Sequence, residues 1–441
     1  MLSAQSVNIW EFADYVVSKP TPSDSKTWDW SPAIQAACDF CNSTFPARPL
    51  AISTLCRIAT PIVINRPIDG DSVRDTFTII GTDGGGFIVD SAIAMFTSTI
   101  APVMSGSPLQ PMSVAQTIRF KGLVLTSTDP SLNAFILDGN KFLRVWLESC
   151  DISKIKFAFT TSYLQSIYFV GCNIRLWEGV FIQATGGSYD VRVIAGTLAE
   201  HGEDFLYLIS STSDKEVTGC SVNESCIEGL SGVAIRYAHA RGMSVTYCYF
   251  EGNEQPDIIA NDFPGTVNKG ITHSGNLHAC TSANKLNVNF YPVVWGPTSG
   301  GMSMGNTSDH NMNEVRSDTQ VVCFDHAAGE MLSNDSRSRP GDIMYGTVSP
   351  QVNNTSYGSR VWKPGSIVLN NSGAKNITGW WTPDGTLWYP FGPVDDGSFW
   401  RFPDSTGADH FRVATVDGAS LETSMYVRYS NGVSQVIARV T

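Results

Sequence analysis

A short pattern recurs in the middle of the chain, and this repeat limits the possible folds more than any other feature of the sequence. The stretch "VWLESCDISKIKFAF" at 145–159 is followed by the similar "YFVGCNIRLWEGVFI" at 168–182. The recurring position is held by Cys150, Cys172, Gly196, Cys220 and Cys248, at intervals of 22, 24, 24 and 28 residues. An apolar residue stands three places before each of these positions and another two places after it.

Each interval also holds a second apolar stretch, such as "VFI" at 180–182 and "FLYLI" at 205–209, so each period reads as at least two short strands joined by turns. A unit of about 24 residues cannot bury its apolar face alone, and it stacks on its neighbours as a solenoid. The strands are rich in Val, Ile, Phe and Tyr and show no helical period, which disfavours leucine-rich and helical repeats. The repeat therefore predicts an all-β fold built on a parallel β-helix, with the small recurring residue in one interior slot of successive rungs.

A helix is predicted ahead of the repeat, over 31–44. The stretch "SPAIQAACDFCNSTF" begins with Ser31 as the N-cap and Pro32 at the first helical position. One face of this helix is apolar and is formed by Ile34, Ala37, Cys38 and Cys41. We expect this short amphipathic helix to cover the open end of the β-helix.

The pattern predicts four segments. We expect an N-terminal capping region at 1–75, the β-helix at 76–335, a small β module at 336–393, and a C-terminal β segment at 394–441. The last segment contains "SMYVRYSNGVSQVIARV", which reads as a hairpin around Asn431-Gly432.

Composition excludes several kinds of partner. The 441-residue chain carries a formal net charge of −12, which argues against a nucleic-acid surface and an anionic membrane. It has no run of 18 apolar residues and does not open with a basic stretch followed by an apolar one, so we expect neither membrane insertion nor a classical secretion signal. The ten cysteines are scattered along a long chain and are predicted to be buried free thiols, with no metal site and no cofactor.

Both ends of the chain carry motifs of one family. The phrases "NIWEFAD", "SDSKTWDWSPAIQAAC", "RIATPIVI" and "IIGTDGGGFIV" resemble the opening of pectate-lyase-like phage tailspikes and capsule depolymerases. In that family an extended segment, an Asp-containing turn (here Asp24 and Asp29) and an A-I-Q-A-A helix (here Ala33–Ala37) lead into a right-handed parallel β-helix. The chain departs from the pattern at Glu11-Phe12-Ala13, where Asp-Phe-Gly is usual. The stretch 339–392 is similar to the small β module that follows the β-helix in many tailspikes.

The resemblance implies a function that the repeat alone does not. It implies a homotrimer on the virion tail, attached to other phage tail proteins and made in the host cytoplasm. Such a protein binds, and usually cleaves, a bacterial surface polysaccharide: capsule, exopolysaccharide or O-antigen. We expect cleavage by carboxylate-based endoglycosidic hydrolysis, and the alternatives are a polysaccharide lyase of the same fold and a receptor-binding adhesin without catalysis. The resemblance also implies that the C-terminal segment at 394–441 serves trimerisation or receptor binding.

Carboxyl groups are the residues on which hydrolysis would depend. An endoglycosidase needs two of them, about 5 Å apart for retention or about 6.5–9.5 Å for inversion. Neighbouring strands lie about 4.8 Å apart, so equivalent side chains on adjacent rungs fall near the first distance and those two rungs apart fall near the second. Acidic residues gather between the two strands of successive rungs: Glu178, Glu203, Glu224, Glu228, Glu251, Glu254 and Asp257.

Within this cluster we assign roles by position. The predicted catalytic residues are Glu178, Glu203 and Asp204, with Glu228 and Glu254 behind them. The predicted substrate-binding residues are Trp177, Arg175 and His201, the last two of which suit a lyase if the polymer contains uronic acid. Two other interpretations stay open: that acidic turns only reflect an acidic protein, and that Trp177 packs within its own turn. A groove within one chain and a groove between subunits are equally compatible with the sequence.

Overall fold

The computed structural model of the chain describes the first part almost completely and the last part as separate strands. The described residues are 6–43, 47–65, 76–99, 103–105, 110–113, 116–161, 164–210, 216–261, 267–287, 289–316, 320–327, 343–346, 367–370, 379–381, 386, 389–391, 399–403, 410–415, 423–428 and 434–440. The chain forms two compact units, Met1–Val322 and Cys323–Thr441. The division falls within strand β35 (Gln320–Ala327), before the end of the β-helix expected at residue 335.

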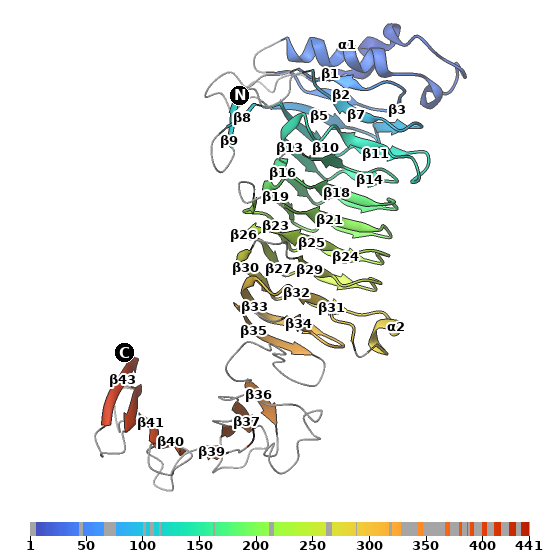
Figure 1. Cartoon of the computed structure of the whole chain (residues 1–441). Coiled ribbons are helices and arrows are strands. Elements are labelled where there is room, and N and C mark those ends of the chain that lie inside the picture. Colours follow the sequence, from blue (N-terminus) through green and yellow to red (C-terminus); the bar gives the residue numbers. More distant parts are fainter. Residues whose placement is uncertain are drawn as a thin grey trace. The chain divides into compact units, whose positions relative to one another are not determined.

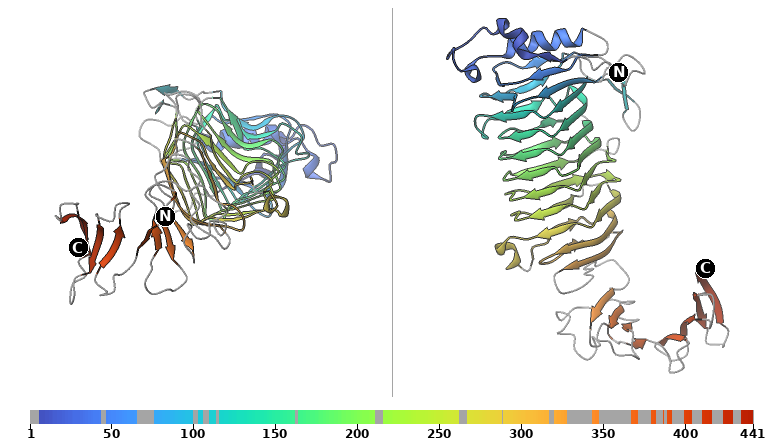
Figure 2. Two further views of the ribbon diagram at one scale, coloured as in Figure 1. Left: turned by 60° about the horizontal axis from the view of Figure 1, so that its bottom comes forward. Right: turned by 180° about the vertical axis from the view of Figure 1, so that it is seen from behind.

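The first unit is a parallel β-helix, as the repeat predicts (Figure 1). Each rung has three strands, where the apolar stretches predict at least two, and we call the three stacks of strands faces A, B and C. All pairings between successive rungs are parallel. Seen from behind, the same regular stack of strands is visible along the whole unit (Figure 2).

The strands of face A are β1 (Val7–Asn8), β2 (Leu50–Ile52), β5 (Phe77–Gly81), β10 (Gln116–Lys121), β13 (Phe142–Glu148), β16 (Leu164–Val170), β19 (Ser188–Ile194), β22 (Val217–Thr218), β23 (Ser221–Asn223), β26 (Ala240–Arg241), β27 (Ser244–Thr246), β30 (Asn268–Ser274) and the first part of β33 (Ser299–Ser308). The strands of face B are β3 (Leu55–Ile58), β6 (Gly86–Val89), β11 (Val124–Ser127), β14 (Asp151–Ser153), β17 (Asn173–Arg175), β20 (Leu198–Glu200), β24 (Cys226–Glu228), β28 (Tyr249–Glu251), β31 (Leu277–Ala279) and the end of β33.

The strands of face C are β4 (Ile62–Val63), β7 (Ala94–Thr97), β12 (Phe135–Leu137), β15 (Ala158–Thr160), β18 (Val180–Ala184), β21 (Asp204–Leu208), β25 (Ile235–Ala238), β29 (Ile258–Asn261), β32 (Val293–Trp295) and β34 (Asn313–Val315). A hairpin of β8 (Val103–Ser105) and β9 (Gln110–Ser113) forms a separate two-stranded sheet.

Interior side chains stack in columns because successive strands are in register. On face A one column holds Leu147, Phe169, Val193, Val222 and Val245. Every member is fully buried, and each apolar side chain removed from water contributes about 1.5–3 kcal/mol. The core is therefore continuous along the axis of the β-helix.

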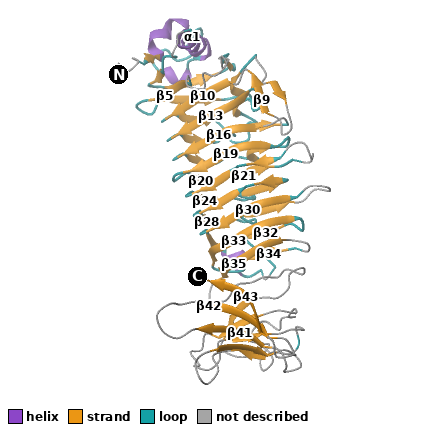
Figure 3. Cartoon of the chain, turned by 90° about the vertical axis from the view of Figure 1, so that its left-hand side faces the viewer, coloured by secondary structure: helices purple, strands orange, loops and turns teal. Residues whose placement is uncertain are grey.

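The helix α1 (Ser31–Asn42) lies at one end of the strand stack, as predicted (Figure 3). Its predicted apolar face is buried. The predicted N-cap is wrong by one residue, because Trp30 holds that position and makes no side-chain cap. Asp29 takes over the capping bond, its Oδ1 accepting from the Ser31 backbone N at 3.0 Å. The Ser31 hydroxyl instead accepts from the backbone N of Ala59 at 2.9 Å, which ties the helix to the first rung.

The predicted interior slot exists at the corner between faces A and B, but the spacing rule misplaces two of its occupants. The partner of Val193 is Val222, 29 positions later, so this rung is longer than the two rungs before it. Strand register consequently puts Thr197 and Ser225 in the slot instead of Gly196 and Cys220. The slot holds Cys150, Cys172, Thr197, Ser225, Cys248, Asn276 and Asn306 in successive rungs.

Buried polar side chains in this slot satisfy backbone groups of the neighbouring rung. The Asn276 Oδ1 accepts from the Cys248 backbone N at 2.9 Å, and the Asn306 Oδ1 accepts from the Asn276 backbone N at 2.9 Å. All ten cysteines are free, as predicted, and eight of them are buried. Burial raises the pKa of the Cys248 thiol to about 11, so this thiol is inert at neutral pH.

The second unit contains two four-stranded sheets. One consists of β36 (Ile343–Gly346), β37 (Ile367–Asn370), β38 (Gly379–Trp381) and β39 (Tyr389–Phe391), and the other of β40 (Phe399–Pro403), β41 (His410–Thr415), β42 (Thr423–Arg428) and β43 (Ser434–Val440). Strands β42 and β43 pair antiparallel, and the predicted turn at Asn431-Gly432 between them lies outside the described residues. Within the described part of the chain, no helix has the length and apolar character needed to cross a bilayer.

Candidate functional site

Three carboxylates lie in register on the outer side of face B. The middle residue of each three-residue strand points inward, as the buried Ile174, Ala199, Ile227 and Phe250 show. The last residue of each strand therefore points outward, because side chains alternate along a strand. These last residues are Arg175, Glu200, Glu228 and Glu251 on four consecutive rungs. We call Glu200, Glu228 and Glu251 the acidic column.

Rung spacing gives the acidic column distances that suit glycoside chemistry. Adjacent members stand about 4.8 Å apart along the column, and its two ends about 9.6 Å apart. The first value fits the carboxyl separation of retaining enzymes, and the second lies at the upper limit for inverting ones. Side chains on strands are also held more rigidly than side chains on loops, which favours a fixed reacting geometry.

Donors on the same strands orient two of these carboxylates. The Tyr249 hydroxyl donates to Glu251 Oε2 at 2.7 Å, and the Cys226 thiol lies 3.6 Å from Glu228 Oε2. The bond to Glu251 raises the pKa of Tyr249 to about 12. Burial, followed by the charges of Glu228, Glu251 and Glu200, raises the pKa of Cys226 to about 12. The first shift reflects mainly the hydrogen bond to Glu251, and the second mainly the burial of the thiol, with the three carboxylates adding to it.

Arg175 and His201 border the acidic column at the end nearer the N-terminus. The Arg175 Nη2 lies 3.1 Å from Asp151 Oδ2, which holds the guanidinium beside the column. The His201 Nε2 lies 4.0 Å from Glu200 Oε2, and 64% of its side chain is exposed. A Cβ at Gly229 would come within 2.8 Å of His201 Nδ1, so glycine is required there for this imidazole position. The predicted substrate-binding residues Arg175 and His201 therefore both lie next to carboxylates and are open to solvent.

The first predicted carboxylate pair lies in the turn after face B and has a different environment. Val180 pairs with Asp204, so Glu203 stands beside Gly179 rather than beside Glu178. The Glu203 Oε2 accepts from the Gly179 backbone N at 2.7 Å. Lys156 is also near: partial burial lowers its pKa, while the charges of Glu203 and Glu178 act in the opposite direction. The turn therefore holds two carboxylates around an ammonium group, out of register with each other.

Three other predicted residues have structural surroundings. The Asp204 Oδ1 accepts from the Val233 backbone N at 2.6 Å, so this carboxylate ties two rungs together. Trp177 is only 2% exposed; its ring packs on Phe181 and Phe205, and its Nε1 donates to the Asp204 carbonyl at 2.8 Å. This ring therefore presents no face to a ligand, and Trp177 packs within its turn. Glu254 is exposed, three residues beyond the acidic column.

Glu200 is not among the residues predicted from the sequence, and neither is the alignment of Glu251 with Glu228. A signal for both exists in the triplets "NIR", "LAE", "CIE" and "YFE", which end at Arg175, Glu200, Glu228 and Glu251. Each triplet directly follows the corner slot, so the slot positions found by strand register would have revealed the column.

A second missed feature is an aromatic stack on the outer side of face A. The rings of Trp146 and Tyr168 are stacked with centroids 5.4 Å apart and planes 7° apart, and both residues are half-buried. The Arg192 guanidinium lies 5.8 Å from the Tyr168 ring and pairs with Asp190 at 2.6 Å. The two residues are direct partners on consecutive strands, so the stack is a cross-strand pair that supports face A. In the described part of the chain, no group of three His, Cys, Asp or Glu side chains is arranged to hold a metal ion.

Comparison with known proteins gives the fold a precedent. No family model matches the chain. The crystal structure of the tailspike protein of Acinetobacter baumannii phage AM24 is similar with a TM-score of 0.52 and 14% identity, covering 99% of this chain and 72% of that one. The tailspike protein of Acinetobacter phage vB_ApiP_P1 is similar with a TM-score of 0.44 and 12% identity, covering 100% of this chain and 80% of that one. The chain thus has the β-helical fold of the AM24 tailspike, in agreement with the resemblance of its motifs.

Proposed function

We propose that this protein is a phage tailspike depolymerase. It binds a bacterial surface polysaccharide and hydrolyses internal glycosidic bonds of that polysaccharide. The observation that carries the proposal is the acidic column, in which three outward carboxylates stand in register on consecutive rungs. The fold shared with the AM24 tailspike supports the tailspike part of the proposal, whereas a fold alone does not define a reaction. We also propose that this protein is attached to the tail of the virion.

In the proposed mechanism, Glu228 and Glu251 act on one glycosidic bond. Glu228 donates a proton to the leaving oxygen, and Glu251, oriented by the Tyr249 hydroxyl, attacks the anomeric carbon to form a covalent glycosyl-enzyme. Glu228 then removes a proton from the water that releases the sugar, so the anomeric configuration is retained. Arg175, His201 and Glu200 bind the neighbouring sugar unit. This assignment replaces Glu178 and Glu203 as the first choice, because those carboxylates surround Lys156 and are out of register.

The test is digestion of purified capsular polysaccharides and O-antigens from a panel of bacterial strains, with mass spectrometry of the products. Hydrolysis adds one water to each pair of product ends, and NMR of the fresh products gives their anomeric configuration. Unsaturated ends that absorb near 235 nm would show a lyase instead, with Arg175 and His201 as the groups to examine. Binding without any cleavage would make the protein an adhesin and would contradict the role of the acidic column.

A further inference from the structure

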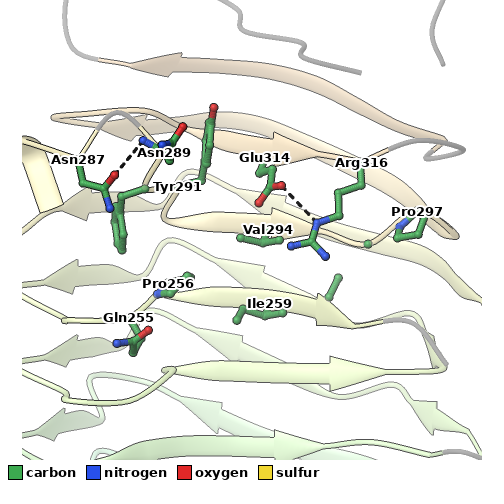
Figure 4. A pocket seen from close by; sticks show the side chains of 13 residues that line it. Gln255, Pro256, Ile259, Asn287, Asn289, Tyr291, Val294, Pro297, Glu314 and Arg316 are labelled. Carbon is green, nitrogen blue, oxygen red and sulfur yellow. Dashed lines mark hydrogen bonds and ion pairs between the residues drawn. The ribbon is translucent and has the colours of Figure 1, made fainter. Parts of the chain in front are cut away.

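A hollow on face C lies away from the acidic column and has a volume of about 630 Å³. Ile259, Val294 and Glu314 point outward on three consecutive strands and are in register (Figure 4). This volume falls within the range of about 300–1,000 Å³ that is usual for pockets enclosing a small organic ligand. The site is therefore large enough for a short stretch of saccharide.

An enlarged turn builds one wall of this hollow. Residues 280–292 connect β31 to β32 and number 13, whereas the equivalent turn between β17 and β18, residues 176–179, has four. The long turn carries the short helix α2 (Ser282–Lys285), followed by Asn287, Asn289 and Tyr291. In Figure 4 the two asparagines and Tyr291 stand on one side of the hollow, and Glu314 and Arg316 on the other.

Several hydrogen bonds fix this wall. The Asn287 Oδ1 accepts from the Asn289 backbone N at 3.1 Å, and the Asn287 carbonyl lies 2.9 Å from His310 Nε2. The Asn311 Nδ2 donates to the Phe290 carbonyl at 2.9 Å. A wall held at several points loses little conformational entropy when a ligand binds, which favours affinity.

The lining combines an apolar floor with polar groups of opposite character. Ile259 and Val294 form the floor, and Tyr291 adds an aromatic ring beside it. The Arg316 Nε lies 3.3 Å from Glu314 Oε1, and 54% of the Arg316 side chain is exposed. Together the amides, the guanidinium and the carboxylate offer both donors and acceptors around an apolar surface. A pyranose ring has the matching chemistry, with an apolar face and a rim of hydroxyl groups.

The carboxylate content argues that this site binds without cutting. Glycoside hydrolysis requires two carboxyl groups, and Glu314 is the only one among the described residues that line the hollow. This carboxylate is also paired with Arg316, so the site as a whole carries no net charge. We infer that the hollow is a second, non-catalytic saccharide site, which takes an uncharged sugar unit of the same polysaccharide. The inference rests on the proposed function for the identity of the polymer.

A second site on the same chain raises retention on a long polymer, because the second binding event is intramolecular. We would measure it by surface plasmon resonance on the immobilised polysaccharide that the protein degrades, using full-length protein with Glu228→Gln so that the surface stays intact. Tyr291→Ala and, separately, Arg316→Gln in that background are expected to shorten the residence time on the polymer at least tenfold. Leu286→Ala is the matched control, because this side chain is 86% exposed on the same turn and does not line the hollow.

A second readout separates this inference from the proposed function. With Glu228 restored, the Tyr291 and Arg316 variants are expected to cleave the shortest cleavable oligosaccharide at a rate within twofold of the unmodified protein. Unchanged residence times in both variants, with normal thermal unfolding, would overturn the second site and leave the depolymerase proposal standing. Loss of cleavage of the short oligosaccharide would also overturn it, by making the hollow part of the catalytic site. A protein that neither binds nor cuts any polysaccharide would overturn both proposals.

Discussion

At the scale of single residues, Glu228 is the position on which the proposed chemistry depends most. It stands between Glu200 and Glu251, so each possible carboxylate pair of adjacent rungs includes it. We expect Glu228→Gln to lower kcat by 10²–10⁴-fold, the usual contribution of a positioned acid or base, with little change in thermal stability. The measurement is the rate of reducing-end release from the cognate polysaccharide.

Glu254→Gln serves as the matched control for that experiment, since Glu254 is exposed and lies three residues outside the column. It should retain activity within twofold. If Glu254→Gln and Glu228→Gln lose activity equally, or if Glu178→Gln alone abolishes it, the reacting carboxylates lie in the turns and the assignment to the strands is wrong.

His273 gives the molecule a residue-scale dependence on pH. This side chain is fully buried, and burial, with a smaller contribution from His278, lowers its pKa from 6.5 to about 3. Below pH 6.5 the unfolded chain binds a proton at this residue that the folded chain does not bind. The free energy of unfolding therefore falls as the pH decreases from 6.5 toward 3, by about 3 kcal/mol at pH 4, and above 6.5 this residue adds no pH dependence.

The check is the thermal midpoint of unfolding measured from pH 7 to pH 4. His273→Gln should show a shallower decline than the unmodified protein, because the variant lacks the imidazole that only the unfolded chain protonates. Parallel curves for the two proteins would mean that His273 titrates alike in the folded and unfolded chains.

Some residues of the candidate site could be predicted from the sequence and others could not, because their alignment depends on the register between distant strands. Arg175 and His201 do border a carboxylate column, and Glu228 belongs to it, because outward positions next to a strand are polar by necessity. Trp177 was misjudged, since one position along a tight turn decides whether a side chain faces the interior or the solvent. Glu200 was missed, because only pairing between distant strands reveals that it aligns with Glu228.

At the scale of elements, the helix α1 binds backbone groups of the strand β4 that a neighbouring strand would otherwise pair with. The Gln35 Oε1 accepts from the Val63 backbone N at 2.7 Å, and its Nε2 donates to the Val63 carbonyl at 2.9 Å. These two bonds occupy the backbone groups that β4 would offer to a further rung. A free strand edge of this kind invites pairing with another chain.

We expect Gln35→Leu to lower the free energy of unfolding by about 1–3 kcal/mol, because it leaves a backbone donor and an acceptor of β4 without their partner. Asp39→Asn is the control. Asp39 is exposed, and the asparagine keeps the oxygen that accepts from Gln35 Nε2 at 3.0 Å, so this variant should stay within about 0.5 kcal/mol of the unmodified protein. Calorimetry on the full chain measures both, and a Gln35→Leu protein as stable as the control would show that the helix covers the end by apolar packing alone.

Elements were more predictable than residues. The helix, the β-helical class and two of the three strands of each rung follow from the apolar spacing, which reflects local chain geometry. The three-residue strands of face B were hidden, since a strand of that length has a single inward residue and hence no period of its own. Unequal rungs misled the spacing rule at Cys220, whose place in the slot Ser225 takes.

At the scale of the whole molecule, we propose a homotrimer, the assembly that the resemblance to tailspikes implies. Each chain has a mass of 47.8 kDa, so light scattering on protein eluted from a size-exclusion column should give about three times that value. The buffer should contain about 0.15 M salt, because interactions between exposed charges are then largely screened. A monomeric mass would exclude a groove between subunits and leave the acidic column to work within one chain. A trimer that dissociates under dilution with loss of activity would instead place part of the site on a neighbouring subunit.

The unequal turns also bear on how such a protein can diversify. Between faces B and C the connection grows from four residues at 176–179 to 13 at 280–292, while the strands on either side keep their parallel pairing. An insertion at this corner leaves the columns of the core intact, since the chain departs from the stack and returns to it at the same rung. The length of the loop at this corner can therefore differ between rungs while the register of the strands, and with it the packing of the core, is kept.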